Sequence, residues 1–446
     1  MKTLVIGAGG REHALALKLA QDAEVHAAPG NPGIGEIATL HDVDPMSGTA
    51  VAELATALGV DLVVVGPEAP LVAGVADAVR AVGIPVFGPS QAAARLEGSK
   101  AFSKSVMADA GVPTAGSRTC TTDEEVAAAL EEFGAPYVVK DDALAAGKGV
   151  VVTRDRGEAI AHATQCLGGG GKVVVEEFLD GPEVSLFAVC DGTMAYPLQP
   201  AQDFKRIFDG GHGPNTGGMG SYTPLTWAQP DLAEVVMATV VQPTLAEMAR
   251  RGAPFVGCLY VGLALTGSGP RVIEFNCRFG DPDIQPVLAV LDSSLSELLS
   301  AAARGELSSV AAPVFRDEAA VTVVLASAGY PESSSTGDVI TGVVEAAAAG
   351  ADVIHAGTAL VSTSSTGEGG STDGGRSTGG GRSTDDGAAL VTAGGRVLAV
   401  RATGGDVAAA RANAYAAADL IAFDGMQRRS DIAAEPLGVM EGASLR

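Results

Sequence analysis

The first hundred residues alternate short apolar runs with segments of helical character, and this alternation constrains the fold more than any other feature of the chain. The region runs through TLVIGAGGREHALALKLA, EVHAAPGNPG, VAELATALGVDLVVVGPEAPLV and AVRAVGIPVFGPS. Alternating β and α segments of this length form a parallel sheet with right-handed crossovers. The sequence therefore predicts an α/β domain with a parallel sheet over residues 1–100.

The rest of the chain is long enough for two further domains. The sequence has 446 residues, and at roughly 150 residues per domain this length predicts about three domains, each able to bury a core. Residues 101–312 form a mixed α+β region with several Gly-rich loops, and residues 313–446 form a third, α/β region. Inside the third region, residues 362–389 consist mainly of Gly, Ser, Thr and Asp. Such a stretch can bury almost nothing, so we expect a flexible surface insertion without chemistry of its own.

The charge balance excludes several classes of partner. The formal net charge is -24, from 53 acidic and 29 basic residues, and only 8 of the basic residues are lysines. A field of this sign repels nucleic acid and anionic membranes, so we expect neither as a partner. An acidic, lysine-poor surface is typical of proteins from a high-salt cytoplasm, where screening removes self-repulsion. An ordinary acidic enzyme from a GC-rich genome is the alternative.

Cysteine usage and hydropathy favour a cytoplasmic protein. The five cysteines are scattered and include no CxxC pair, which fits neither a disulfide framework nor a zinc site. No apolar run approaches the ~18 residues of a membrane span. The N-terminal MKTLVIGAGGREHALAL has too short an apolar part for a signal peptide, because Arg11 and Glu12 follow at once.

The first glycine-rich turn, GAGGRE, partly matches the GxGxxG fingerprint of dinucleotide-binding proteins. Gly7 and Gly9 fit that pattern, but Glu12 stands where the third glycine belongs. A carboxylate there would lie beside a pyrophosphate, so nicotinamide binding is not expected. The helix N-terminus can still hold an anion or a polar substrate, and a plain βα turn is the alternative.

Two lysines flank a loop of small residues in YVVKDDALAAGKGVVV, residues 137–152. Lys140 ends a predicted strand, and Lys148 lies between Gly147 and Gly149. One fixed ammonium group, with a second carried by a lid that excludes water, suits a triphosphate. The stretch is not a Walker A motif. Taken alone, surface lysines at a strand end would explain it equally well.

A second strand end follows about 30 residues later, in KVVVEEFLDGPEVSLFAV. Glu176 and Glu177 close an apolar run, and Glu183 follows seven residues after Glu176. The backbone at such a strand end can pair with an adenine edge, and the later carboxylate can accept ribose hydroxyls.

The stretch VIEFNCRFGDPD, residues 272–283, carries the clearest candidate for a metal site. Glu274 and Asn276 are two residues apart on a predicted strand, so their side chains share one face. Carboxylate and amide oxygens are hard ligands suited to Mg²⁺. Arg278 continues this face and suits an anionic substrate or the charge that develops in phosphoryl transfer. A salt-bridged structural cluster is the alternative.

These motifs together resemble a known family. The order Lys100, Lys140, Gly147–Gly149, EEFLDGPE and EFN is similar to that of ATP-grasp enzymes. The strings VIGAGGREHALA, VVGPEAPLVAGVAD, FGPS, LEGSKAFSK, GPNTGGMGSY and IEFNCRFGDPD resemble those of glycinamide ribonucleotide synthetases. The resemblance extends from Met1 to HAGT and GGRVLAV near the C-terminus, and only residues 362–389 lie outside it.

The resemblance implies a fold and a reaction. The fold would comprise a Rossmann-like domain (1–100), an ATP-grasp domain (101–312) with a mobile lid subdomain at about 120–187, and a C-terminal α/β domain (313–446). In the reaction, ATP, glycine and 5-phosphoribosylamine give glycinamide ribonucleotide, ADP and phosphate through a glycyl phosphate, in purine biosynthesis. The cofactors would be ATP and Mg²⁺ or Mn²⁺, and the protein would be a monomer.

The resemblance also implies roles for individual residues. ATP would be bound by Lys100, Lys140, Gly147, Lys148, Gly149, Glu176, Glu177, Phe178, Leu179 and Glu183. Glu274 and Asn276 would hold the metal, and Arg278 and Lys148 would act in catalysis. The other substrates would contact Gly9, Gly10, Glu68, Asp203, Lys205, Gly217, Gly218, Met219, Arg278 and Asp281.

Three departures from the family pattern stand out. Asp141 and Ala143 replace the usual Ala and Gly of the lysine loop, and Gly211 replaces an acid after RIFDG. The strand LYVGLAL lacks the acidic metal ligand that other ATP-grasp enzymes often carry about a dozen residues before the ExN motif. Another ATP-grasp carboxylate–amine ligase and a non-catalytic nucleotide-binding protein are the alternatives.

Overall fold

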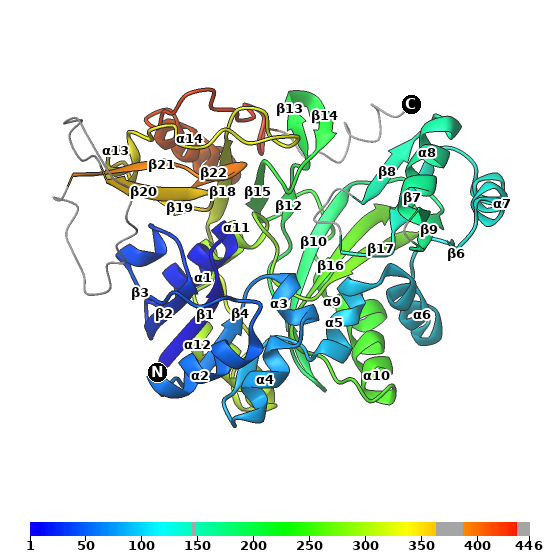
Figure 1. Cartoon of the computed structure of the whole chain (residues 1–446), viewed down its shortest axis with the longest axis horizontal. Helices are drawn as coiled ribbons and strands as arrows, with labels where there is room; N and C mark the ends of the chain where they lie inside the picture. Colours follow the sequence, from blue (N-terminus) through cyan, green and yellow to red (C-terminus); the bar gives the residue numbers. More distant parts are fainter. Residues whose placement is uncertain (145–148, 169, 363–386, 435–446) are drawn as a thin grey trace, which may run out of the picture.

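The structure is a computed structural model that describes residues 1–144, 149–168, 170–362 and 387–434. Gly147, Lys148 and residues 363–386 of the predicted insertion lie outside the described residues, so the structure does not test the predictions made for them. Figure 1 shows the whole chain.

The N-terminal part contains the predicted parallel sheet, in the order β3-β2-β1-β4-β5. Its strands are β1 (Lys2–Gly7), β2 (Glu24–Pro29), β3 (Thr39–Leu40), β4 (Leu62–Val65) and β5 (Val86–Phe87). The helices of this part are α1 (Gly10–Leu19), η1 (Ile34–Glu36), α2 (Gly48–Leu58), α3 (Glu68–Val72) and α4 (Val75–Ala81). Because β1 and β4 are parallel neighbours, the turns that follow them lie at one edge of the sheet. That edge carries Gly9 and Glu68, at the usual place for a ligand in an open α/β sheet.

The central part is built on two antiparallel sheets (Figure 1). The larger has the order β11-β10-β16-β17, from β10 (Glu183–Asp191), β11 (Ala195–Pro197), β16 (Val256–Thr266) and β17 (Gly269–Asn276). The smaller has the order β6-β9-β7-β8, from β6 (Ser117–Cys120), β7 (Tyr137–Asp141), β8 (Val150–Thr153) and β9 (Val173–Glu176).

Helices complete both halves of the central part. The smaller sheet packs against α7 (Asp123–Phe133) and α8 (Arg156–Leu167). The other half contains the helices α5 (Gln91–Gly98), α6 (Lys100–Ala110), α9 (Leu232–Val236), η3 (Met237–Val241) and α10 (Gln242–Arg250). It is followed by α11 (Ile284–Val290), α12 (Leu295–Arg304) and η4 (Leu307–Ser309). The smaller sheet is the segment expected to form the lid.

The third large sheet crosses the expected boundary at residue 312. Its order is β12-β15-β18-β22-β19, from β12 (Gln202–Asp203), β15 (Gly220–Thr223), β18 (Ala319–Ala326), β19 (Asp352–His355) and β22 (Arg396–Gly404). Helix α14 (Val407–Ala418) packs against β18 and β22. Because β12 and β15 come from the central region, this sheet ties the central and C-terminal regions together.

The remaining elements are small. They are β13 (Arg206–Phe208), η2 (Asp209–Gly211), β14 (His212–Asn215), α13 (Val343–Ala348), β20 (Thr358–Ser362) and β21 (Ala388–Thr392). The pairing of β20 with β21 begins at Ser362 and Ala388. The first residue and the last two of the predicted insertion, 362, 388 and 389, are therefore strand residues rather than loop.

The helical stretch Leu232–Arg250 corrects one expectation from the sequence. It has 19 residues and, within the described part of the chain, is long and apolar enough to cross a membrane, although no stretch was expected to approach that length. Its inward face, including Val236, Val240, Leu245 and Met248, is buried in the largest apolar core. Length and composition alone are weak evidence for a span, and this burial is what a core helix requires.

Candidate active site

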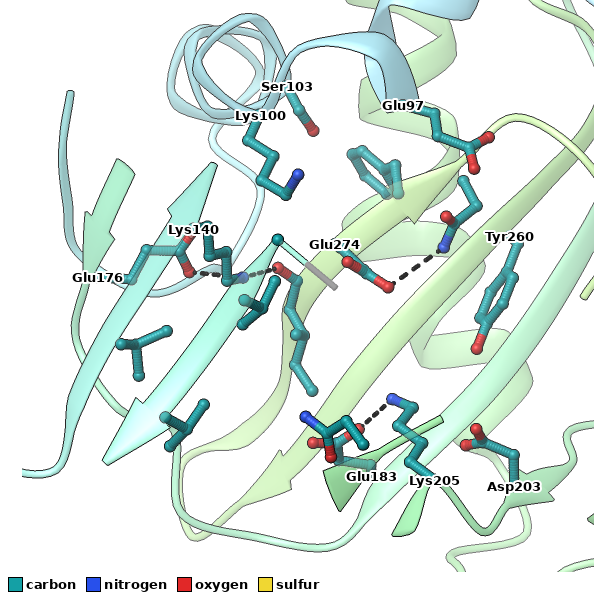
Figure 2. A pocket seen from close by; sticks show the side chains of 18 of the residues that line it. Glu97, Lys100, Ser103, Lys140, Glu176, Glu183, Asp203, Lys205, Tyr260 and Glu274 are labelled. Carbon is teal, nitrogen blue, oxygen red and sulfur yellow. Dashed lines mark hydrogen bonds and ion pairs between the residues drawn. The ribbon is translucent and has the colours of Figure 1, made fainter. Parts of the chain in front are cut away.

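A cavity of about 890 Å³ lies between the two central sheets. The N-terminal region, the loop after β14, and the C-terminal region also contribute to its wall, through Glu68, Gly217 and Arg396 respectively. Figure 2 shows one part of this wall, with Glu274 between Lys100 and Lys140 on one side and Lys205 on the other. Of the predicted residues that the structure describes, most line this cavity; Gly9, Gly10, Gly218 and Met219 do not.

Lys140 is fixed at the end of β7 by two contacts. Its ammonium group donates to the carbonyl oxygen of Ile273 at 2.9 Å and pairs with Glu176 Oε2 at 3.0 Å (Figure 2). Lys100, the first residue of α6, donates to the carbonyl oxygen of Ala143 at 3.2 Å. Two positive groups thus face the cavity from different elements.

The two glutamates at the end of β9 are both engaged in ion pairs. Glu176 is 3% exposed and pairs with Lys104 at 3.1 Å as well as with Lys140. Glu177 pairs with Arg271 at 2.9 Å and accepts the Gly116 N–H at 3.1 Å. These hydrogen bonds from Arg271 and Gly116 lower the pKa of Glu177. An adenine at this strand end would therefore meet the backbone, with Phe178 and Leu179 also lining the cavity.

Glu183 and Lys205 form an ion pair at the other end of the cavity (Figure 2). Burial alone would lower the pKa of Lys205, but Glu183 and Asp203 raise it well above its ordinary value. Lys205 therefore stays positive and holds Glu183 near the place where a ribose is expected.

Glu274 and Asn276 lie side by side on β17, as their spacing predicts. The Asn276 side-chain amide donates to Glu274 Oε1 at 3.4 Å. Burial alone would raise the pKa of Glu274, but Lys205, Lys140 and Lys100 together hold it below its ordinary value. The carboxylate is therefore ionised, as a hard cation requires.

The donor set around Glu274 fits a metal that takes most of its ligands from elsewhere. Among the described residues, no group of three or more His, Cys, Asp or Glu side chains could hold a metal ion. Gly262 of β16 pairs directly with Glu274, so a glycine stands where a further acid would face it. One carboxylate and one amide suit Mg²⁺, which keeps several positions for water and phosphate oxygens.

Arg278 is held by carboxylates from two elements. Its guanidinium pairs with Glu68 at 3.3 Å and with Glu97 at 3.1 Å, and it donates to Asn276 Oδ1 at 3.3 Å. Burial would lower the pKa of Arg278, but Glu97 and Glu68 raise it above its ordinary range. Arg278 therefore links the N-terminal sheet edge to β17, which carries Glu274 and Asn276.

The side chain of Glu12 occupies the turn after β1. Glu12 Oε2 accepts the Gly9 N–H at 2.6 Å, and Glu12 pairs with Arg11 at 2.6 Å. A Cβ atom added to Gly66 would lie 2.1 Å from Glu12 Oε1. Glu12 thus fills the space that a dinucleotide pyrophosphate would need. A Cβ added to Gly10 would lie 3.3 Å from Asp281 Oδ1, which brings the turn and Asp281 together.

The segment 213–220, which runs from β14 into β15, is held by the C-terminal region. Arg396 donates to the carbonyl oxygens of Gly217 and Asp281, both at 2.6 Å, and pairs with the Asp281 carboxylate at 2.9 Å. Gly218 has a φ of 109°, and a Cβ there would lie 2.4 Å from Pro282 Cδ, so only glycine fits. Met219 was expected to contact substrate, but it is fully buried in an apolar core because β15 begins at the next residue.

Several residues of this site were not predicted from the sequence. Lys104, Glu97 and Arg396 lie within the strings LEGSKAFSK, RLEGSK and GGRVLAV, but only the fold brings them to the cavity. The same is true of a buried cluster in which Ser185 donates to Asp283 Oδ1 at 2.5 Å and hydrogen-bonds the Tyr260 hydroxyl at 2.8 Å. Burial and the neighbouring Asp283 raise the pKa of Tyr260 well above its usual value.

The fold and this site define an ATP-grasp enzyme. Two antiparallel sheets enclose lysines, an ionised carboxylate–amide pair and a strand end suited to adenine. Sequence models of phosphoribosylglycinamide synthetase match the chain in order, with the N domain at residues 1–97, the ATP-grasp (A) domain at 98–284 and the C domain at 320–435. The chain belongs to the phosphoribosylglycinamide synthetase family.

Individual relatives agree with this assignment. The chain is 59% identical to the phosphoribosylamine–glycine ligase of Streptomyces coelicolor over 444 residues, covering 98% of this chain and 100% of the relative. It is similar to the crystal structure of phosphoribosylamine–glycine ligase from Thermotoga maritima, with a TM-score of 0.80, 32% identity and coverage of 97% and 100%. A biotin carboxylase domain from Hydrogenobacter thermophilus in complex with MgADP shares the fold, with a TM-score of 0.67, 16% identity and coverage of 96% and 91%.

Proposed function

We propose that this chain is a phosphoribosylamine–glycine ligase. It joins glycine to 5-phosphoribosylamine at the expense of ATP, giving glycinamide ribonucleotide, ADP and phosphate in purine biosynthesis. The observation that carries this proposal is one cavity whose wall combines the ionised Glu274, the phosphate-facing lysines and a distant anion-binding side around Arg278, in a chain that matches the family along nearly its whole length.

The nucleotide occupies the side between the two central sheets. Lys100 and Lys140 contact the phosphates, the backbone at Glu176–Leu179 frames adenine, and Glu183 accepts the ribose hydroxyls once Lys205 yields part of its contact. Glu274 and Asn276 hold Mg²⁺ or Mn²⁺, which would neutralise phosphate charge when bound. Gly147, Lys148 and Gly149 belong to the same proposed set; of these only Gly149 lies within the described residues, and Lys148 is proposed as catalytic.

The chemistry needs no protein nucleophile. A glycine carboxylate oxygen attacks the γ-phosphorus, the bond to the bridging oxygen breaks, and ADP leaves. The amine nitrogen of phosphoribosylamine then attacks the acyl carbon of the glycyl phosphate, phosphate leaves with the bonding electron pair, and the nitrogen releases one proton to phosphate or solvent as the amide forms. The protein positions the reactants, supplies positive charge and excludes water from a hydrolysable intermediate.

The amine substrate occupies the side formed by three distant segments. Gly9, Gly10 and Glu68 lie on the N-terminal edge, and Arg278 and Asp281 lie opposite. Asp203, Lys205 and the loop with Gly217, Gly218 and Met219 shape the glycine and phosphate region, Met219 from within the core. Arg278 also stabilises charge that develops during transfer.

The setting of the enzyme is part of the proposal. The domains at 1–100, 101–312 and 313–446 are supported by the family matches at 1–97, 98–284 and 320–435. Within the central domain we place the lid at about 120–187. The negative net charge supports small-molecule partners only, with neither nucleic acid nor membrane. We place the protein in the cytoplasm, as a monomer.

A substrate-omission experiment tests the proposal. Phosphate release from ATP is measured with glycine and freshly generated 5-phosphoribosylamine, each left out in turn. Release should require both. Equal turnover with bicarbonate, or with D-alanine alone, would assign the chain to another carboxylate–amine or carboxylase-type reaction, and no turnover with any set would favour a non-catalytic nucleotide-binding protein.

A further inference from the structure

Lys104 is a nearly buried lysine on the nucleotide side of the cavity, and it takes no part in the proposed reaction. It lies one helical turn after Lys100 on α6 and is 9% exposed. Its ammonium group donates to Thr114 Oγ1 at 2.9 Å and to the carbonyl oxygen of Ala115 at 3.1 Å, and it pairs with Glu176 Oε2 at 3.1 Å. An ammonium group has three N–H donors, so these contacts satisfy all of them.

The Glu176 oxygen that Lys104 holds is the same one that holds Lys140. Lys140 pairs with Glu176 Oε2 at 3.0 Å and also donates to Ile273, the residue before the metal ligand Glu274. Lys104, Glu176 and Lys140 therefore form one chain of contacts from α6 through β9 to β7 and β17. With both lysines protonated the three side chains carry one net positive charge, which favours a polyphosphate in the cavity.

We propose that protonated Lys104 is a positioning residue for the nucleotide: it holds Glu176, and through it Lys140, in the place where Lys140 meets the ATP phosphates, and ATP binding draws a proton onto it. The inference rests on the proposed function only in that the cavity binds ATP. Lys104 lines the cavity but need not touch the nucleotide, because it acts through Glu176 and Lys140.

The surroundings of Lys104 make its charge responsive near neutral pH. Burial lowers its pKa to about 8, Glu176 from β9 opposes this, and Lys140 from β7 and Arg271 from β17 lower it further. At pH 8 about half of the nucleotide-free enzyme would carry a proton on Lys104. A bound polyphosphate raises the pKa of a nearby lysine, so binding should take up as much as about half a proton.

Calorimetry measures this proton directly. Mg·ATP is titrated into the enzyme at pH 8, without glycine or phosphoribosylamine, in Tris and in EPPS, whose ionisation enthalpies differ. The wild type should take up close to half a proton, and uptake should shrink toward pH 7, where Lys104 is already protonated. A lysine that only packs the fold would leave the proton count at zero.

Three variants separate charge from titration. Lys104→Arg keeps the charge but does not titrate, so it should bind Mg·ATP within about threefold of the wild type with no proton uptake. Lys104→Met should lose the uptake and bind about tenfold or more weakly, since a charged hydrogen bond is removed beside two buried charges. Lys172→Met, which removes an exposed lysine from the same sheet region, should match the wild type in both.

The outcomes distinguish this inference from the proposed function. Binding of Mg·ATP by the wild type without proton uptake would overturn the role of Lys104 alone, as would uptake that survives in Lys104→Arg. If Lys104→Met fails to fold, the arginine variant still decides. A wild type that binds no Mg·ATP would overturn the proposed function itself.

Discussion

The two sides of the cavity are built in different ways. On the nucleotide side, charges are balanced between neighbouring strands and one helix, as in the contacts of Glu176 with Lys104 and Lys140. On the amine side, the key contacts join the central region to the N-terminal and C-terminal regions: Arg278 with Glu68, and Arg396 with Asp281. The nucleotide side can keep its shape as one unit, whereas the amine side exists only when three regions of the chain are packed together.

This difference predicts how the substrates will respond to mutation. A change on the nucleotide side should alter ATP binding and leave the binding of the amine substrate unchanged. A change in the packing between regions should do the reverse. Glu274 lies between the two sides, so its loss should affect the reaction itself.

The largest effect should come from Glu274→Gln. The substitution keeps the shape but removes the ionised oxygen ligand that three lysines stabilise. We expect kcat to fall on the order of 10²–10³-fold with the folded state intact, because a charge that stabilises phosphoryl transfer is lost. Steady-state rates across Mg²⁺ concentrations measure this, with circular dichroism as the check on folding. Glu297→Gln, on the helix α12 and away from the cavity, is the matched control. Wild-type rates in Glu274→Gln at limiting Mg²⁺ would show that Glu274 has only a structural role.

The next effect should separate the two sides. Arg396→Met removes the contacts to Gly217 and Asp281 from the C-terminal region. It should raise the KM for phosphoribosylamine about tenfold or more and leave the KM for ATP within about twofold. Lys140→Met should raise the KM for ATP about tenfold or more and leave the KM for phosphoribosylamine within about twofold.

The comparison of these two variants is the control, since each loses one cation of the cavity wall. If both raised the KM of both substrates equally, the cavity would respond as one unit and the division into two sides would be wrong.

Low pH should destabilise the packing between the N-terminal and C-terminal regions, because two buried histidines lie where these regions meet. His13 of α1 accepts the backbone N–H of His355 of β19 at 2.7 Å, which joins the N-terminal and C-terminal regions. Burial lowers the pKa of His13 to about 3 and that of His355 to about 4, from an ordinary value of 6.5. Below pH 6.5 the unfolded chain binds protons that the folded chain does not.

The stability contributed by neutral His13 and His355 is therefore present above pH 6.5 and is lost as the pH falls from about 6.5 toward 4. Each histidine should cost as much as about 2 kcal/mol by pH 5. Urea unfolding between pH 7.5 and 4.5 measures the slope, and His13→Gln should flatten it by up to one proton. An unchanged slope in that variant would show that other groups control the acid limb.

The smallest effect should come from replacing residues 363–386, whose composition of mainly Gly, Ser, Thr and Asp predicts no chemistry. The paired strands β20 and β21 meet at Ser362 and Ala388, so a short Asn-Gly turn can replace the connection. Activity and the thermal midpoint should stay close to the wild type, because loop closure depends weakly on length. A large loss of either would mean that the Gly- and Ser-rich segment contributes contacts that its composition does not predict.

The sequence predicted which residues line the nucleotide side of the cavity better than which line the amine side, and the reason is physical. Lys140, Glu176 and the pair Glu274 and Asn276 stand at strand ends, where a period of two residues tells which side chains lie together. No local pattern could show that Arg396 would reach Asp281, 115 residues away. The parallel sheet followed from β–α alternation, but the sheet that joins β12 and β15 to the C-terminal strands depends on packing between regions.

The local sequence also did not predict which side chains near the site are paired or buried. Glu176 looked like an adenine contact, but its carboxylate is shared by two lysines. Met219 looked like part of a substrate loop, but it is a core residue. Both depend on burial, which the sequence around them does not specify.

The most direct test of the account follows one oxygen atom through both sides of the cavity. Glycine labelled with ¹⁸O in both carboxylate oxygens is supplied with ATP and phosphoribosylamine, and the released phosphate is analysed by mass spectrometry. If glycyl phosphate forms on the nucleotide side and is captured by the amine from the other side, each phosphate carries one ¹⁸O and the amide product keeps the other. Unlabelled phosphate would mean that water, and not glycine, attacks ATP, and would contradict the account.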